Sequence, residues 1–420
     1  MDRDSLINQF LKVRGHTEKL VKPLAIEDYV VQPIEDVSPP KWHIGHTTWF
    51  FERVVLQQYK ENYRPFDERY YYIFNSYYET FGERVMRSLR GTLSRPTVEV
   101  VMDYRKAITE RTAEFMKNCS DNTWNEIELL IKIGINHEQQ HQELFLMDIK
   151  NIYASNPLQP QYSNYNHNGI PDRKPAGEFL TFAGGMHEIG ADGTGFAYDN
   201  EFPRHKVYLH DFKLARNLVS CGEFLEFIDS GGYEKATLWL SDGWAAVQEN
   251  KWNSPLYWEK DNDGWKIMTL NGLKPLDPNE PVSHVSHYEA DAFARWAGKR
   301  LPTEEEWEIA AGKTEAESRP GSFMDDNTFH PVARKDEGRG LNSMYGDVWE
   351  WTQSAYLPYP GYKQAPDALG EYNAKFMNNQ MVLRGGCCAT PRDHFRPTYR
   401  NFFQSDKRWP YTGFRLAEDA

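Results

Sequence analysis

A pair of histidines, His137 and His141, lies within a stretch that the sequence predicts to be one long helix. Thr123 and Glu126 match a capping box at its start, and Pro157 follows its end. The inward positions recur at alternating steps of three and four, which is typical of the buried seam of a helical bundle. They are Ile127, Leu130, Gly134, His137, His141, Leu144 and Asp148. Both imidazoles therefore face a core, where a shared metal ion would satisfy them; the alternative is a pair of ordinary surface or core histidines.

A second predicted helix offers a third imidazole. Ser38-Pro39-Pro40 is expected to open it, with Ser38 as the N-cap and a proline at the first helical position. By three-four spacing His46 faces inward among aromatic residues, and His43 lies one turn earlier on roughly the same side, so either is a candidate ligand. Three neutral imidazoles leave coordination positions open, as in a catalytic site, and affinity alone does not choose among iron, zinc and copper.

Residues 1–155 are predicted to form a four-helix bundle that carries these ligands. Two further amphipathic patterns, from 4 to about 20 and from 98 to about 117, bring the number of helices to four. The connection 61–96 is long for a bundle, and long connections in compact domains often carry function.

Five side chains in this half are candidate substrate or catalytic contacts. Tyr77 and Tyr78 on the long connection offer phenols that can give a proton or an electron. Arg87 and Arg90 can clamp a carboxylate in bidentate fashion. Gln140 lies next to the second histidine of the pair and can project beside the metal. The alternatives are aromatic packing, a solvated basic loop and a surface amide.

The second half of the chain has a different character. Prolines are frequent in residues 156–176, which are predicted to be a linker, and residues 177–420 are predicted to form a second domain of short strands and many turns. A strand is expected over 178–182 and helices over 220–228 and 288–297. Thr303 and Glu306 match the start of another helix. The expected fold class is therefore α+β.

Composition excludes some classes of partner. The chain has 48 Lys and Arg against 61 Asp and Glu, a net charge of −13, which argues against nucleic acid or an anionic membrane. Neither a membrane-spanning run nor a signal-peptide pattern is present, and the four cysteines lack metal-ligand spacing, so we expect a cytoplasmic location. The abundance of aromatic residues suits a loop-rich fold with aromatic anchors, or a pocket for a cationic ligand.

The motifs resemble a known enzyme family. Residues 41–52 and 137–143 resemble the DinB-like half of the ergothioneine-pathway sulfoxide synthases. The second half resembles the formylglycine-generating-enzyme (sulfatase-modifying-factor) domain, a variant of the C-type lectin fold. Its marks are residues 184–190, 300–308, 345–352, 382–386 and 413–417, and residues 398–403 are especially like the synthases. The resemblance thus implies a DinB-like bundle followed by a lectin-like domain.

The resemblance also implies a metal and a reaction. The metal is non-haem Fe(II), held by His46, His137 and His141, with His46 preferred to His43. The family uses O₂ to join a thiol, cysteine or γ-glutamylcysteine, to the imidazole C2 of hercynine (Nα-trimethylhistidine). It also oxidises the sulfur to a sulfoxide.

Further residues match positions that contact the substrates in the family. Gln140 and Asn401 match contacts of the trimethylated histidine, with Phe402 on its apolar side. Arg87 and Arg90 match the region that holds the carboxylates of the thiol donor.

A tyrosine pair and one further position separate branches of the family. Tyr77 and Tyr78 resemble a tyrosine pair of one branch, whereas another branch takes its catalytic tyrosine from the second domain. That other branch has an acidic residue where Phe403 stands, a departure that puts recognition of the γ-glutamylcysteine amino group in doubt and makes free cysteine a plausible donor.

Other functions fit parts of the pattern. A zinc-dependent thiol transferase would use the same three imidazoles without O₂. Relatives that act on histidine C5 or on a selenium donor share the motifs. A formylglycine-generating oxidase is disfavoured because Cys387 and Cys388 are adjacent rather than spaced. A non-catalytic lectin-like binding protein would leave the inward histidines without a role.

Overall fold

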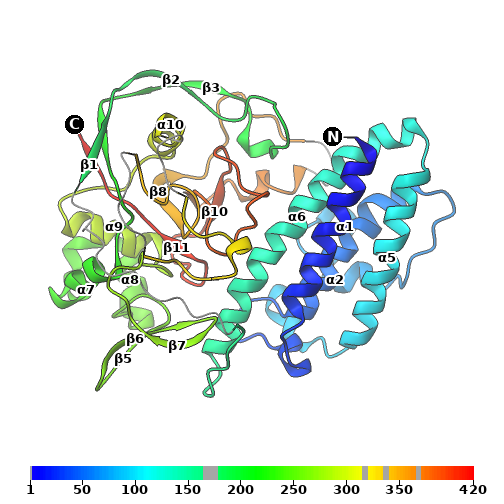
Figure 1. Ribbon diagram of the computed structural model, residues 1–420, viewed down its shortest axis with the longest axis horizontal. Coiled ribbons are helices and arrows are strands. Elements are labelled where there is room, and N and C mark those ends of the chain that lie inside the picture. The colour runs from blue at the N-terminus through cyan, green and yellow to red at the C-terminus, as the bar shows by residue number, and fades with distance from the viewer. Residues whose placement is uncertain (1, 164–177, 315–319, 334–339, 366–369) are drawn as a thin grey trace. The chain divides into compact units, whose positions relative to one another are not determined.

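The computed structural model describes residues 2–163, 178–314, 320–333, 340–365 and 370–420. The chain divides into two compact units, shown in Figure 1. Unit 1 comprises Met1–Ser163 together with Pro366–Tyr372, and unit 2 comprises Asn164–Ala365 and Asn373–Ala420. Most of the predicted linker, 156–176, lies outside the described residues.

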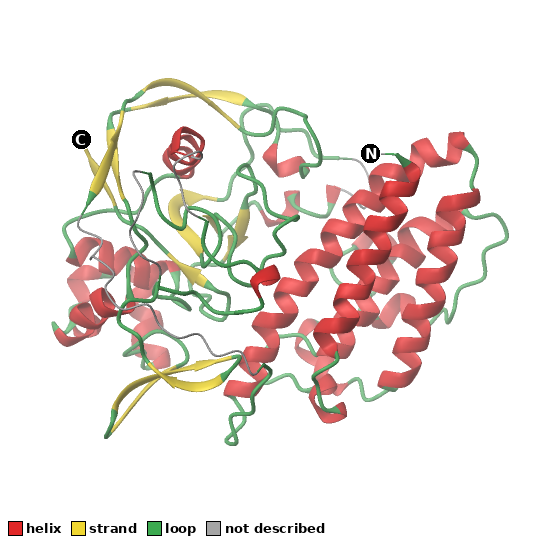
Figure 2. Cartoon of the chain, viewed as in Figure 1, coloured by secondary structure: helices red, strands yellow, loops and turns green. Residues whose placement is uncertain are grey.

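Unit 1 is a four-helix bundle, as the sequence predicts (Figures 1 and 2). Its long helices are α1 (Arg3–Val21), α2 (Pro40–Phe50), α5 (Val98–Asn118) and α6 (Asp121–Ala154). Helices α1 and α2 each pack against both α5 and α6. A π-helical segment, Phe51–Leu56, and α3 (Gln57–Tyr59) continue α2. Shorter elements are η1 (Ile26–Val30), α4 (Tyr70–Ile73), η3 (Glu79–Phe81) and η4 (Arg87–Thr92).

Two predicted helix caps are wrong. Helix α6 begins at Asp121, and its N-cap is Ser120, whose side chain accepts a hydrogen bond from the Thr123 N–H. The capping box expected at Thr123 therefore lies inside the helix. Helix α2 has Pro40 as its first residue, but Ser38 does not cap it. The Ser38 hydroxyl instead accepts a hydrogen bond from Arg90, and its N–H donates to a carboxylate of α6.

One buried ion network joins all four long helices of unit 1. The carboxylate of Glu138 (α6) accepts hydrogen bonds from Arg14 and Thr17 (α1) and from Arg105 (α5), at 2.9, 2.6 and 2.5 Å. Arg14 also donates to Thr48 of α2 at 3.0 Å. A buried charge of this kind is tolerated because it is paired and fully hydrogen-bonded. The network fixes α6 against its three neighbours.

The described residues of unit 2 form short strands and four α-helices, in agreement with the predicted character of this half. A four-stranded sheet has the order β10 (Asn401–Phe403), β9 (Met381–Arg384), β8 (Trp349–Ala355), β11 (Thr412–Gly413), in which only β11 and β8 are parallel. A three-stranded antiparallel sheet has the order β1 (Phe179–Phe182), β4 (Phe212–Ala215), β12 (Ala417–Asp419). A hairpin, β2 (Gly185–Ile189) with β3 (His205–Leu209), and a meander, β5 (Trp258–Asp261), β6 (Gly264–Thr269) and β7 (Gly272–Pro275), complete the described strands.

The predicted elements of unit 2 are confirmed, and one helix is additional. The strand over 178–182 is β1, and the predicted helices are α7 (Cys221–Asp229), α9 (His287–Trp296) and α10 (Glu304–Thr314). Thr303 and Glu306 form the reciprocal hydrogen bonds of a capping box at the start of α10. Helix α8 (Ser241–Asn250) is not predicted from the sequence. Among the described helices, none combines the length and apolar character that crossing a membrane requires.

Candidate metal centre

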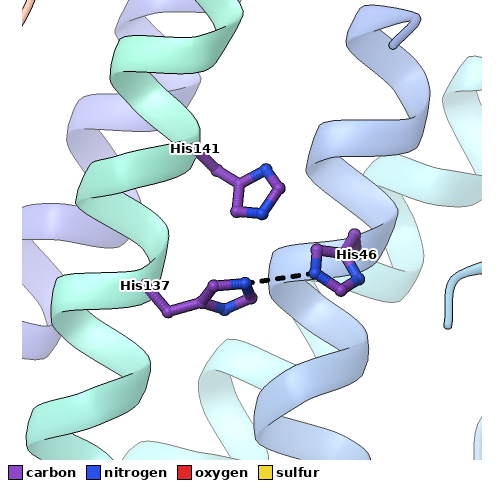
Figure 3. A group of neighbouring side chains, drawn as sticks. All are labelled: His46, His137 and His141. Carbon is purple, nitrogen blue, oxygen red and sulfur yellow. Dashed lines mark hydrogen bonds between the residues drawn. The ribbon is translucent and has the colours of Figure 1, made fainter. Parts of the chain in front are cut away.

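Three imidazoles meet in the core of unit 1. His46 comes from α2, and His137 and His141 come from consecutive turns of α6, so that their rings converge (Figure 3). One nitrogen from each ring lies within 4.8 Å of the others. The Nε2 atoms of His46 and His137 are 3.1 Å apart. This spacing is compatible with adjacent positions around one ion, because a metal–imidazole bond is about 2.0–2.1 Å long.

The ring of His46 is held by a backbone carbonyl. Its Nδ1 lies 2.6 Å from the carbonyl oxygen of Phe74. A carbonyl only accepts, so Nδ1 carries the proton and Nε2 presents its lone pair to the cluster. Gly45 permits this approach, because a Cβ atom at that position would overlap the Phe74 ring. Trp42 and Trp49 stack on the His46 ring with centroids at 4.6 and 5.6 Å.

Burial keeps the three imidazoles neutral. It lowers the pKa of His137 to about 3 and the pKa values of His46 and His141 well below their ordinary range, and repulsion among the rings adds to the shift of the latter two. Neutral imidazoles offer the lone pairs that a metal ion needs. The Nδ1 atom of His137 has no hydrogen-bond partner within the described part of the chain. The donor set, its burial and its spacing therefore fit a divalent transition metal.

His43 does not belong to this cluster, although its spacing in the sequence left it open as a ligand. Its Nδ1 lies 2.8 Å from Nδ1 of His141, and its Nε2 lies 2.9 Å from a carboxylate oxygen of Asp148. His46 therefore shares a cluster with both histidines of α6, whereas His43 contacts His141 from the side of Asp148.

The two predicted tyrosines stack on each other, and the ring of Phe50 lies between Tyr78 and the histidine cluster. The rings of Tyr77 and Tyr78 stack at 4.7 Å, and Tyr78 lies 6.4 Å from Phe50, whose ring is 5.0 Å from His137. Burial raises the pKa of Tyr77, so its phenol keeps its proton at neutral pH.

A third tyrosine, Tyr372, was not predicted. It belongs to the segment of unit 1 that comes from late in the chain. Its ring centroid is 5.8 Å from that of His137, and its hydroxyl donates a hydrogen bond to Gln140 Oε1. No local sequence pattern marks it, because more than two hundred residues separate it from the helix it contacts. Gln140 thus lies beside the cluster with its carbonyl engaged by a phenol.

The two candidate arginines differ in their surroundings. Arg90 is buried, donates to the hydroxyls of Ser38 and Ser76 at 2.9 and 3.0 Å, and lies 3.3 Å from the ring centroid of Trp42. Within the described residues no carboxylate forms an ion pair with it. Arg87 is exposed and donates to the backbone carbonyl of Asp36. Arg90 is therefore a buried cation beside the ring that stacks on His46.

Asn401, Phe402 and Phe403 form strand β10 of unit 2. The strand pairs with β9, and Phe402 stacks on Tyr356 with centroids 4.0 Å apart. Arg400, directly before the strand, donates to both carboxylate oxygens of Glu304, at 2.9 and 2.8 Å. This bidentate buried pair holds the start of β10.

Comparison with known proteins agrees with both units. Residues 9–145 match the DinB superfamily, and residues 168–420 match the sulfatase-modifying factor enzyme 1-like domain. The chain is 33% identical over 312 residues to the hercynine oxygenase of Mycolicibacterium thermoresistibile, an alignment that covers 68% of each protein. It is 34% identical over 314 residues to the hercynine oxygenase of Mycolicibacterium smegmatis, covering 68% of this chain and 70% of that protein.

A formylglycine-generating enzyme from Streptomyces coelicolor is also similar, with 29% identity over 300 residues that cover 59% of this chain and 88% of that protein. The predicted fold class is thus confirmed, a DinB-like helical domain followed by a formylglycine-generating-enzyme-like domain. On this evidence the chain belongs to the hercynine oxygenase family.

Proposed function

We propose that the protein is an Fe(II)-dependent sulfoxide synthase of ergothioneine biosynthesis. In this proposal O₂ drives formation of a C–S bond between the imidazole C2 of hercynine and the sulfur of cysteine or γ-glutamylcysteine, with oxygenation of the sulfur. The observation that carries it is the buried cluster of His46, His137 and His141 in a chain of the hercynine oxygenase family. These three residues would hold the metal. Bound iron would supply redox chemistry toward O₂ that zinc lacks.

Arg90 is the proposed anchor for the carboxylate of the thiol donor. A buried guanidinium whose described partners are two hydroxyls gains a charged hydrogen-bond partner when a carboxylate binds. Its planar fork suits bidentate contact with a carboxylate. Arg87, which is exposed, adds positive charge nearby in the sequence and is proposed as a weaker second contact.

Hercynine carries a quaternary ammonium group, which aromatic faces attract. Gln140 is proposed to contact it from the side of the imidazole cluster, since Gln140 and His137 both contact Tyr372. Asn401 and Phe402 of β10 are proposed as further hercynine contacts on the resemblance alone. The same resemblance places Phe403 at the position that discriminates between thiol donors, and its apolar ring favours free cysteine.

Three tyrosines are candidates to hold or move a proton during the reaction. Tyr372 is the nearest to the cluster by the described contacts, and its hydroxyl is already oriented by Gln140. Tyr78 packs against Phe50 and Trp49, whose rings lie between it and the histidines, and Tyr77 packs on Tyr78 and Tyr372. We therefore propose Tyr372 ahead of the pair as the proton donor.

The test is reconstitution of the full chain with Fe(II) under anaerobic conditions, followed by O₂, hercynine and each thiol in turn. The expected result is a hercynine–thiol sulfoxide by mass spectrometry, with substitution at C2 shown by NMR. Failure to form product with either thiol would refute the proposal for these substrates. Oxygen consumption coupled to thiol use separates it from a zinc-dependent thiol transferase, and substitution at C5 would identify the histidine-C5 relatives instead.

A further inference from the structure

A hydrogen-bonded chain of three side chains runs away from the metal cluster inside unit 1. It begins at His141, passes through His43 of α2 and ends at Asp148 of α6, with separations of 2.8 and 2.9 Å. His43 and Asp148 are only 4% and 2% exposed, so bulk water does not compete for these contacts. The same Oδ2 atom of Asp148 also accepts the N–H of Ser38 at 2.8 Å.

The chemistry of these groups fixes where the protons lie. A carboxylate oxygen that accepts the Ser38 N–H is an acceptor toward His43 as well, so Nε2 of His43 is the donor. A neutral imidazole with its proton on Nε2 has an acceptor at Nδ1. With His43 in this neutral form, His141 is the donor from Nδ1 in the contact between the two Nδ1 atoms, and Nε2 of His141 keeps its lone pair.

We propose that His43 and Asp148 are positioning residues for the metal site. They hold His141 as the Nδ1–H tautomer and aim its Nε2 lone pair at the ion. Partners of this kind are common for metal-binding histidines, where a carboxylate or carbonyl usually contacts the ligand directly. Here an imidazole stands between the carboxylate and the ligand, whereas His46 is held by the Phe74 carbonyl. The inference rests on the three-imidazole site of the proposed function and does not depend on its reaction.

The first test uses the unaltered, metal-free protein with ¹⁵N-labelled histidine. Two-dimensional ¹H–¹⁵N NMR distinguishes the protonated nitrogen of each ring. We expect His141 to carry its proton on Nδ1 and His43 to carry its proton on Nε2. A proton on Nε2 of His141 would overturn the proposal, and this measurement requires neither a variant nor a bound metal.

The second test compares two substitutions of nearly equal shape, His43→Asn and His43→Leu. The amide oxygen of asparagine lies where Nδ1 of histidine lies and accepts from His141, whereas leucine offers no acceptor. Titration with Co(II), followed by its visible spectrum, should show affinity about 10–100-fold lower for His43→Leu and within about threefold of the unaltered protein for His43→Asn.

If His43 only supported the fold, Co(II) affinity would follow stability from one variant to the other. Asparagine is the poorer residue in a buried helix, so His43→Asn should have the lower thermal midpoint of the two variants. We expect it nevertheless to keep the higher Co(II) affinity. Equal Co(II) affinity in the unaltered protein and His43→Leu would overturn the proposal. If the unaltered protein binds no Co(II), the metal site of the proposed function fails, and the tautomer measurement still decides the role of His43 and Asp148.

Discussion

Adjacent residues of α6, His137 and Glu138, serve two buried polar regions that differ in how complete they are. Glu138 is enclosed by donors from α1 and α5, and every charge in its network has an opposite charge within contact. The cluster around His137 instead gathers three neutral lone pairs, with a buried cation, Arg90, in the same unit. The first region is closed and can only stabilise the fold. The second presents lone pairs that a metal ion can take, so substitutions in the first region should affect stability and substitutions in the second should affect metal binding.

The largest effect is expected from the metal ligands. His137→Ala and His141→Ala each remove one of three donors, so metal affinity should fall by more than about 100-fold. The free energy of unfolding of the metal-free protein should also fall, because truncating a buried ring leaves a cavity, but the loss of metal affinity is the effect specific to these positions. Iron content after desalting and Co(II) titration measure the first effect, and chemical denaturation measures the second. Unchanged iron content in both variants would contradict the assignment of these ligands.

Glu138→Gln should behave in the opposite way. It leaves Arg14 buried without its counter-charge and leaves Arg105 with the half-exposed Glu18 at 3.4 Å, which should lower the free energy of unfolding by about 3–5 kcal/mol. The matched control is Glu128→Gln on the same helix, where a half-exposed pair with Lys132 is worth about 0.5 kcal/mol or less. Denaturant unfolding of the three metal-free proteins makes the comparison. Equal stability of Glu138→Gln and Glu128→Gln would contradict a larger stabilising role for the buried network than for a surface ion pair.

The closed region should also respond to acid. Burial alone would raise the pKa of Glu138, but Arg105 and Arg14 lower it from 4.5 to about 2. Because the folded-state pKa is depressed, the contribution is complete above about pH 4.5 and is lost as the pH falls toward 2. A shift of this size corresponds to about 3 kcal/mol. The stability difference between the unaltered protein and Glu138→Gln should therefore shrink between pH 5 and pH 3, and a constant difference would contradict this account.

Beside the histidine cluster, Tyr372→Phe removes a single hydroxyl. If this group holds the proton, kcat should fall about 100-fold, whereas Tyr78→Phe, one aromatic layer away, should have a smaller effect. Steady-state rates of the iron-loaded variants with hercynine and cysteine test this. A larger loss in Tyr78→Phe would transfer the role to the predicted pair.

The smallest effect is expected from Arg90→Lys. The charge remains, but the planar fork is lost, so KM for the thiol should rise about tenfold while KM for hercynine is unchanged. Arg87→Lys is the matched control on the exposed side and should change either constant by much less. An equal rise in both KM values for Arg90→Lys would show that it supports the fold rather than binding the thiol donor.

The sequence predicts what depends on local periodicity. Three-four spacing identifies the seam of α6 that carries His137, His141 and Asp148, and it places His46 on the facing helix. The same spacing cannot separate His46 from His43, because both lie on one side of α2. Contacts with Asp148 and with the Phe74 carbonyl, distant in the sequence, decide between them.

Tertiary contacts explain the other differences. Ser38 has the residue type of an N-cap, but its N–H donates to Asp148 and its hydroxyl accepts from Arg90. Its side chain therefore does not cap α2. Serine and threonine are both good N-caps, so the residue type does not decide between Ser120 and Thr123. The helix extends back to Asp121, and Ser120 therefore caps it. Tyr372 reaches the cluster from a segment that no periodic pattern connects to α6.

The missing side chain at Gly45 has a consequence for how this centre can change during evolution. The atom that orients His46 is a main-chain oxygen, so no substitution of Phe74 itself can delete it. A substitution at residue 45 can disturb that hydrogen bond, because a single added methyl group would displace the Phe74 ring. In a homologous chain, the residue at the position of Gly45 therefore indicates whether the imidazole of His46 can keep its present orientation.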